Sequence, residues 1–183
     1  MTDALTDIAE RFRFYRALAE ASLDQVEDDA FFASLVPSAG SGQAPESNAL
    51  ALLVKHLAGN YHSRWTDFLT ADGNKPDRNR DTEFELYEGD TREALMARWA
   101  EGWQLLDATL ADLRADDLSR TVTIRAEPHT VQAALLRALG HTAYHVGQIV
   151  LLAKYHAGPS WRSLSIPRGQ SDQYAAAHRR RFA

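Results

Sequence analysis

The sequence contains no cysteine in its 183 residues. This absence excludes a disulfide framework, a metal site with thiolate ligands and a cysteine nucleophile. It gives no information about the redox compartment in which the protein works.

Long apolar runs are also missing from the sequence. No stretch approaches the roughly 18 uninterrupted apolar residues of a membrane span. The first residues, MTDALTDIAERFRFY, lack the basic start and apolar stretch of a signal peptide. We therefore expect a cytoplasmic protein that has no membrane partner.

An excess of positive charge is lacking too. The chain has 20 basic and 25 acidic side chains, for a formal net charge of -5, which argues against a nucleic-acid partner. The only dense basic run, Arg179-Arg180-Arg181, is interpreted as a solvated tail. The chain is 45% hydrophobic and 25% charged, as is typical of a soluble globular protein, and its length predicts a single domain over residues 1–183.

Four stretches have apolar residues at every third or fourth position, which predicts helices with one apolar face. The expected helices run from about Leu5 to before Pro37, from an N-cap at Ser47 or Asn48 to about Ala71, from an N-cap at Thr91 to about Leu113, and from Pro128 and Thr130 to about His156. Together they predict an all-α helical bundle. Such bundles commonly build ligand and metal sites from side chains on facing helices.

The segments between the helices are polar or irregular. Residues 38–47 are rich in turn-forming residues and predict a loop. The stretch NKPDRNRDTEFELYEGD is a long polar connection, either functional or an ordered cover without chemistry. Alternation around Val122 and Ile124 predicts a short strand or extended arm. The last residues, SWRSLSIPRGQSDQYAAAHRRRFA, predict a loop followed by a short C-terminal helix.

His141 and His145 interrupt the apolar face of the fourth expected helix. Residues four apart lie one turn apart on the same face, so two such imidazoles can reach one metal ion. A pair of core histidines bonded to the backbone would give the same pattern. Gly140 and Gly147 bracket the pair, and each costs about 1 kcal/mol relative to alanine within a helix. Their presence indicates either the close approach of a helix or ligand, or simple packing.

His56 is the best candidate for a third ligand. It lies in ALALLVKHLAGNYHSRW, whose first half is apolar on all sides and is therefore expected to be deeply packed. The alternative is a core histidine bonded to the backbone. The remaining histidines lie in a turn, on another face or near exposed ends; they are His62, His129, His156 and His178.

The sequence excludes two common metal motifs. A zinc peptidase needs glutamate directly after the first histidine, where this chain has Thr142. A di-iron bundle needs a glutamate three residues before each histidine, and neither histidine has one. Three imidazoles would instead leave coordination positions open, as in catalytic zinc sites. They do not select one metal.

Three polar residues are candidates for the surroundings of such a site. Gln148 could be an outer hydrogen-bond partner of a ligand, Asn60 could orient a ligand or substrate, and Arg64 could meet an anionic group at the rim. The alternatives are a cap, a polar residue on a helix face and a surface salt bridge, respectively. Asp67 and Glu85 are possible general bases, but nothing in the sequence fixes them near the histidines. No catalytic residue is therefore assigned.

Four separated blocks carry a family resemblance: HLAGNYHSRWTDFLTADGNKPDRNRDTEFE, TVTIRAEPHT, HTAYHVGQIVLLAKYHAG and SLSIPRGQS. In this order they resemble a bacterial family of unknown function in the DinB-like superfamily. The superfamily also includes the YfiT-like metal hydrolases and the bacillithiol S-transferases. The resemblance covers most of the chain.

The resemblance implies an antiparallel four-helix bundle with metal ligands at His56, His141 and His145. The block H-x-x-x-H-x-G-Q also matches Gly147 and Gln148. In relatives the metal is zinc, nickel, iron or manganese, and for this chain zinc and nickel are favoured. Many relatives form homodimers.

The function expected from these features is that of a metal-dependent hydrolase or a low-molecular-weight-thiol S-transferase, with a small-molecule substrate. The alternatives are a metal- or ligand-binding stress-related protein without turnover, and a bundle whose histidines only pack.

Overall fold

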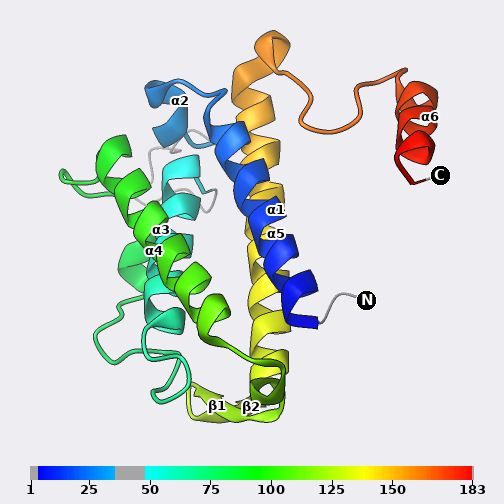
Figure 1. Cartoon of the computed structure of the whole chain (residues 1–183). Helices are drawn as coiled ribbons and strands as arrows, with labels where there is room; N and C mark the ends of the chain where they lie inside the picture. The colour runs from blue at the N-terminus through cyan, green and yellow to red at the C-terminus, as the bar shows by residue number, and fades with distance from the viewer. Residues whose placement is uncertain (1–3, 36–47, 183) are drawn as a thin grey trace.

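The computed structural model describes residues 4–35 and 48–182. Its long helices are α1 (Ala4–Leu23), α3 (Leu50–Trp65), α4 (Arg92–Asp112) and α5 (Val131–Ala157), as Figure 1 shows. Shorter elements are the helices α2 (Asp28–Phe32) and α6 (Ser171–Phe182), the 3-10 turns η1 (Asp81–Phe84), η2 (Ala115–Ser119) and η3 (Gly158–Ser160), and the strands β1 (Thr121–Ile124) and β2 (Glu127–Thr130). The predicted all-α bundle is confirmed.

The four long helices form two pairs that run in opposite directions (Figure 1). Helices α1 and α5 run one way, and α3 and α4 run the other. The contacts between α1 and α4 fit this arrangement, because Trp99 donates to Glu20 at 3.1 Å while the later residue Asp107 pairs with the earlier Arg16 at 3.3 Å. Two consecutive parallel helices need a connection that returns along their length. Residues 66–91 form this connection between α3 and α4.

Large aromatic side chains from three helices fill the centre of the bundle. Phe12 of α1 packs edge-to-face against Trp65 of α3, with ring centroids 6.3 Å apart. Tyr61 of α3 packs against Trp103 of α4 at 4.8 Å in the same manner. Such pairs add to the large apolar area that each ring buries. They hold α1, α3 and α4 together and fix the position of α3, which carries His56.

The predicted helix starts were partly right. The N-cap predicted at Thr91 is confirmed, because its side chain accepts a hydrogen bond from the amide of Ala94. The fourth helix, expected to open at Pro128 and Thr130, begins at Val131, and Thr130 caps it by accepting from the amide of Ala133. The N-cap expected at Asn48 was wrong: α3 begins at Leu50 after Ala49, without a side-chain cap. The alternative cap, Ser47, and the loop at 38–47 lie outside the described residues.

The first predicted helix was also wrong in its extent. Helix α1 ends at Leu23, and a separate short helix, α2, begins at Asp28. Val26 in the intervening turn and Phe31 in α2 are both buried. Their apolar side chains continue the helical spacing across the turn, so spacing alone could not reveal the break.

The short strand expected at Val122 and Ile124 is confirmed, and it pairs with β2 in an antiparallel hairpin. Its two-residue turn, Arg125-Ala126, has positive φ angles of 55° and 62°. The carboxylate of Asp72 accepts hydrogen bonds from both turn amides, each at 2.8 Å. These bonds, the one from Ala126 first, lower the pKa of Asp72 to about 2. Asp72 thereby ties the hairpin to the connection that follows α3.

The C-terminal loop and helix predicted after residue 160 are present, and α6 lies apart from the bundle in Figure 1. None of the described helices combines the length and apolar character needed to cross a bilayer.

Candidate metal centre

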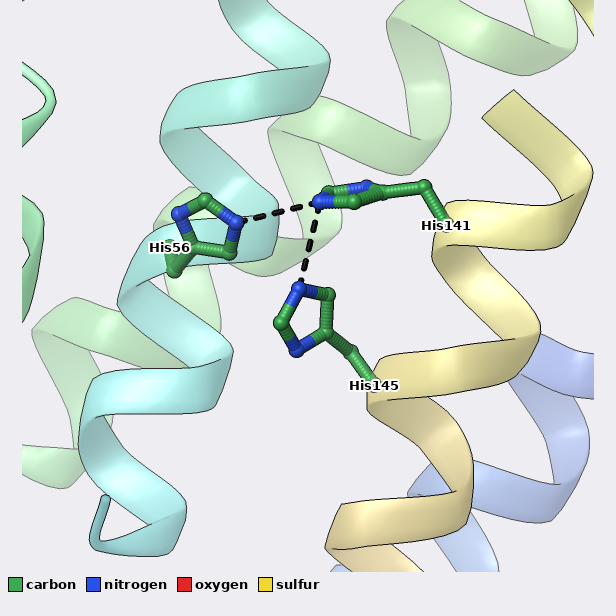
Figure 2. A group of neighbouring side chains, drawn as sticks. All are labelled: His56, His141 and His145. Carbon is green, nitrogen blue, oxygen red and sulfur yellow. Dashed lines mark hydrogen bonds between the residues drawn. The ribbon is translucent and has the colours of Figure 1, made fainter. Parts of the chain in front are cut away.

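Three histidine rings from two helices converge in the bundle, as Figure 2 shows. His56 comes from α3, and His141 and His145 come from successive turns of α5. The Nε2 atom of His141 lies 3.1 Å from Nε2 of His56 and 3.1 Å from Nε2 of His145. One ligand atom from each residue lies within 4.8 Å of the others. The predicted convergence is therefore present, and the three histidines are close enough to bind a metal.

The nitrogen separations match those of ligands on one divalent ion. At Zn–N distances of about 2.0–2.1 Å, two ligand nitrogens are about 3.3 Å apart at a tetrahedral angle and about 2.9 Å apart at a right angle. The observed 3.1 Å lies between these values. A shared proton can lie between only one pair of neutral nitrogens, so hydrogen bonding alone does not account for three rings meeting at Nε2.

Hydrogen bonds on the far side of two rings leave the Nε2 lone pairs available. His56 Nδ1 donates to Glu83 Oε2 at 2.7 Å, because an ionised carboxylate can only accept. His145 Nδ1 donates to Gln148 Oε1 at 2.9 Å. In a neutral imidazole with a proton on Nδ1, Nε2 has the free lone pair. Outer partners of this kind orient the histidine ligands of metal sites.

A second layer of charge holds Glu83 in place. Arg78 donates to both of its carboxylate oxygens, at 2.7 Å and 2.9 Å, and both side chains are buried. Burial alone would raise the pKa of Glu83, but the hydrogen bonds from His56 and Arg78 outweigh it and lower the pKa. Glu83 therefore stays ionised and keeps the proton of His56 on Nδ1.

The protein environment keeps the two α5 histidines neutral. Burial first, and then the nearby charges of His145, His56, Arg78 and Arg64, lower the pKa of His141 to about 3. Burial also lowers the pKa of His145 to about 4, against the opposing effect of its hydrogen bond to Gln148. Neutral imidazole is the form that binds a metal ion.

The histidines line a cavity of about 460 Å³. Asn60 and Arg64, one and two turns along α3 from His56, line the same cavity, as does Gln148. Arg64 is buried, so it does not form the surface salt bridge that was its alternative role. Within the described residues, His62, His129, His156 and His178 do not join the cluster.

The match of a family model places the chain among known proteins. Residues 1–170 match the model described as "Protein of unknown function (DUF1572)". The chain belongs to this family. No curated protein matches it. The DUF1572 match includes all three histidines as well as Glu83 and Gln148, and it ends before α6.

Glu83 is the residue of this site that the sequence did not indicate. The two carboxylates considered as general bases, Asp67 and Glu85, do not line the cavity; Glu85 accepts a hydrogen bond from Tyr87 instead. Glu83 is 27 residues from His56 in the chain and lies in an irregular connection. The only signal in the sequence was the length of that connection. A connection that passes back along α3 can bring one of its side chains to His56.

The close approach of a neighbouring helix that was considered for Gly140 and Gly147 is not found among the described residues, whereas the approach of a ligand stays a prediction. A Cβ atom built at either position would meet nothing within 4 Å among the described residues. Their helix-propensity cost is therefore not offset by packing within the described chain.

Glu83 approaches the backbone closely at Gly59. We therefore expect Gly59→Ala to weaken metal binding about tenfold, which is the lower end of the range for the loss of an outer-shell partner. A Cβ at this position would lie 2.5 Å from Oε1 of Glu83, which is held by Arg78 and cannot move freely. Competition titration with a chromophoric chelator measures the change. Gly89→Ala is the control, because nothing lies within 4 Å of a Cβ there. Equal affinities in both variants would contradict the role of Glu83.

We expect the metal-free protein to lose stability as the pH falls from about 6.5 to about 4. In this window the unfolded chain protonates His141 and His145 near the ordinary histidine pKa of about 6.5. The folded protein does not, because their pKa values are lowered to about 3 and about 4. The unfolded state thus binds more protons, and acid favours it. Unfolding midpoints of chelator-treated protein, measured at several pH values, test this prediction. The midpoint of His145→Gln should depend less steeply on pH than that of the wild-type protein. An equal slope in the two proteins would contradict the prediction.

Proposed function

We propose that this protein is a divalent-metal enzyme of the DinB-like type that acts on a small molecule. The observation that supports it is the convergence of three histidines on the wall of a cavity of about 460 Å³, where Nε2 of His141 lies 3.1 Å from Nε2 of each of the other two. Small-molecule sites usually have volumes of about 300–1,000 Å³. His56, His141 and His145 would hold the ion, with zinc or nickel favoured over iron or manganese.

A divalent ion held by three neutral imidazoles supplies Lewis acidity, which activates water or a thiol as a nucleophile. The chain contributes the positions of the rings. Glu83 keeps the His56 proton on Nδ1, and Gln148 does the same for His145. Asn60, on the cavity wall one turn from His56, would orient a substrate.

The lining of the cavity favours thiol transfer over hydrolysis. None of the described residues that line it is an aspartate or a glutamate, so the described part of the chain offers no carboxylate there as a general base. A thiol bound to a divalent ion is deprotonated outright, whereas water bound to zinc still has a pKa of about 7, so a thiol needs less help from a base. In the proposed transfer, sulfur forms a bond to an electrophilic carbon. The leaving group departs with its electron pair, and the thiol proton passes to solvent.

The test combines a thiol-conjugation screen against electrophiles with a hydrolase panel, using protein loaded with zinc or nickel. His141→Ala is the control, because its Nε2 lies at 3.1 Å from both other rings. We expect turnover in the thiol screen and its loss in the variant. Unchanged activity in the variant excludes the mechanism, and metal binding without any turnover supports the non-catalytic alternative.

The proposal also includes a homodimer and a cytoplasmic location. The homodimer is carried over from the family resemblance. Mass measurement of the purified protein in solution tests it, and a monomer would remove it from the proposal.

A further inference from the structure

Positive charge is concentrated on the wall of the cavity that contains the histidines. Five arginines line it and no described carboxylate does; they are Arg64, Arg78, Arg80, Arg125 and Arg137. They come from α3, from the connection between α3 and α4, from the hairpin turn and from α5. The whole chain has a net charge of -5, so this concentration is local.

Most of this charge is not neutralised within the described part of the chain. Arg78 is committed to Glu83. Arg137 has one distant partner, Glu127, at 3.8 Å, and its side chain is half-exposed. Arg80 lies over the ring of Phe84, and Arg125 donates to the neutral side chain of Asn74. Neither of these last two forms an ion pair there. The cavity therefore keeps positive charge that faces its interior space.

Arg64 is the most unusual of the five. It is only 9% exposed, and its Nη1 atom is buried without a hydrogen-bond partner among the described residues. Burial first, and then the charges of Arg137, Arg78 and Arg125, lower its pKa to about 10. A buried cation without a partner is costly unless an anion compensates it. The fold nevertheless leaves room for this cation, because the adjacent residue in space is Gly73, which has no side chain. A Cβ atom at that position would lie only 2.8 Å from Nη1 of Arg64.

The position of Arg125 is fixed by the backbone. Its amide and that of Ala126 both donate to Asp72, at 2.8 Å. The amide of Gly73 donates to the carbonyl oxygen of Thr123 at 2.8 Å. These bonds hold the hairpin turn beside the segment that follows α3, so Arg64 and Arg125 come to the same cavity from two fixed elements.

We propose that the arginine-lined wall binds an anionic group, a carboxylate or a phosphate, of the small molecule that reacts at the histidines. Guanidinium groups recognise both anions through paired N–H donors. This inference rests on the proposed function, since it names the substrate class of the same site. The neutral end of the substrate would face the three histidines, while Arg64, Arg125 and Arg137 would hold its charge.

The test uses metal-free full-length protein, so that its outcome does not depend on the metal. Calorimetric titrations with inorganic phosphate and with succinate, at low ionic strength, distinguish the two anion chemistries by which one binds more tightly. We expect binding of at least one anion, weakened about tenfold or more by Arg64→Met and by Arg137→Gln, as for the loss of a charge-assisted hydrogen bond.

Arg120→Gln is the matched control. Like Arg137, its side chain is 51% exposed and has one carboxylate partner, but it does not line the cavity. Arg137→Gln keeps the test valid if Arg64→Met fails to fold. The proposal is overturned if neither anion binds, or if the cavity variants and the control bind equally. Metal binding with no anion binding overturns this inference alone, whereas anion binding with no metal binding overturns the proposed function.

Discussion

His141→Ala is expected to abolish tight metal binding. The Nε2 atom of His141 is 3.1 Å from both other ring nitrogens, so its ring links the cluster. Removing an outer-shell partner costs about 10–100-fold in affinity, and the loss of one of three ligands should exceed that, at about 1,000-fold or more. Elemental analysis after desalting, together with chelator competition, measures the effect.

His156→Ala is the control for this variant. His156 lies on the same helix, α5, and is not part of the cluster. We expect it to keep one bound ion per chain. Retention of wild-type affinity by His141→Ala would mean that the ion, if bound, sits elsewhere.

Glu83→Gln is expected to have the largest combined effect on affinity and stability. The glutamine can still accept from His56, but without the charge that holds the proton on Nδ1, so metal affinity should fall about 10–100-fold. The variant also leaves Arg78, only 6% exposed at its side chain, without a carboxylate. Breaking a buried ion pair by removing one partner costs about 3–5 kcal/mol. Chelator competition and denaturant unfolding measure the two effects separately.

Glu85→Gln is the matched control, since Glu85 lies in the same connection and is exposed. We expect little change in metal affinity or in the free energy of unfolding for this variant. If Glu83→Gln behaves in the same way, Glu83 does not support the site.

The fold class and the histidine convergence could be predicted from spacing. The apolar periodicity of residues 92–112 and 131–157 indicated both helices, and the N-cap of the first could also be predicted, at Thr91. Two histidines four apart on a buried face, with a third on another buried helix, were enough to indicate a shared site.

The surroundings of the histidines could not be predicted, because they depend on contacts between distant segments. Glu83 reaches His56, and Arg78 reaches Glu83, only because α3 and α4 are parallel and the connection must pass back along them. The arginine-lined wall is assembled from separate elements, none of which is strongly basic by itself. Arg125 reaches it through a hairpin whose second strand, with Pro128 in it, was expected to open a helix instead.

X-ray absorption at the zinc edge of reconstituted wild-type protein tests the three-histidine site most directly. The site predicts one zinc ion per chain with three imidazole nitrogens at about 2.0–2.1 Å, completed by exchangeable oxygen ligands. A first shell with fewer than three imidazoles, or one made of oxygen alone, would contradict it.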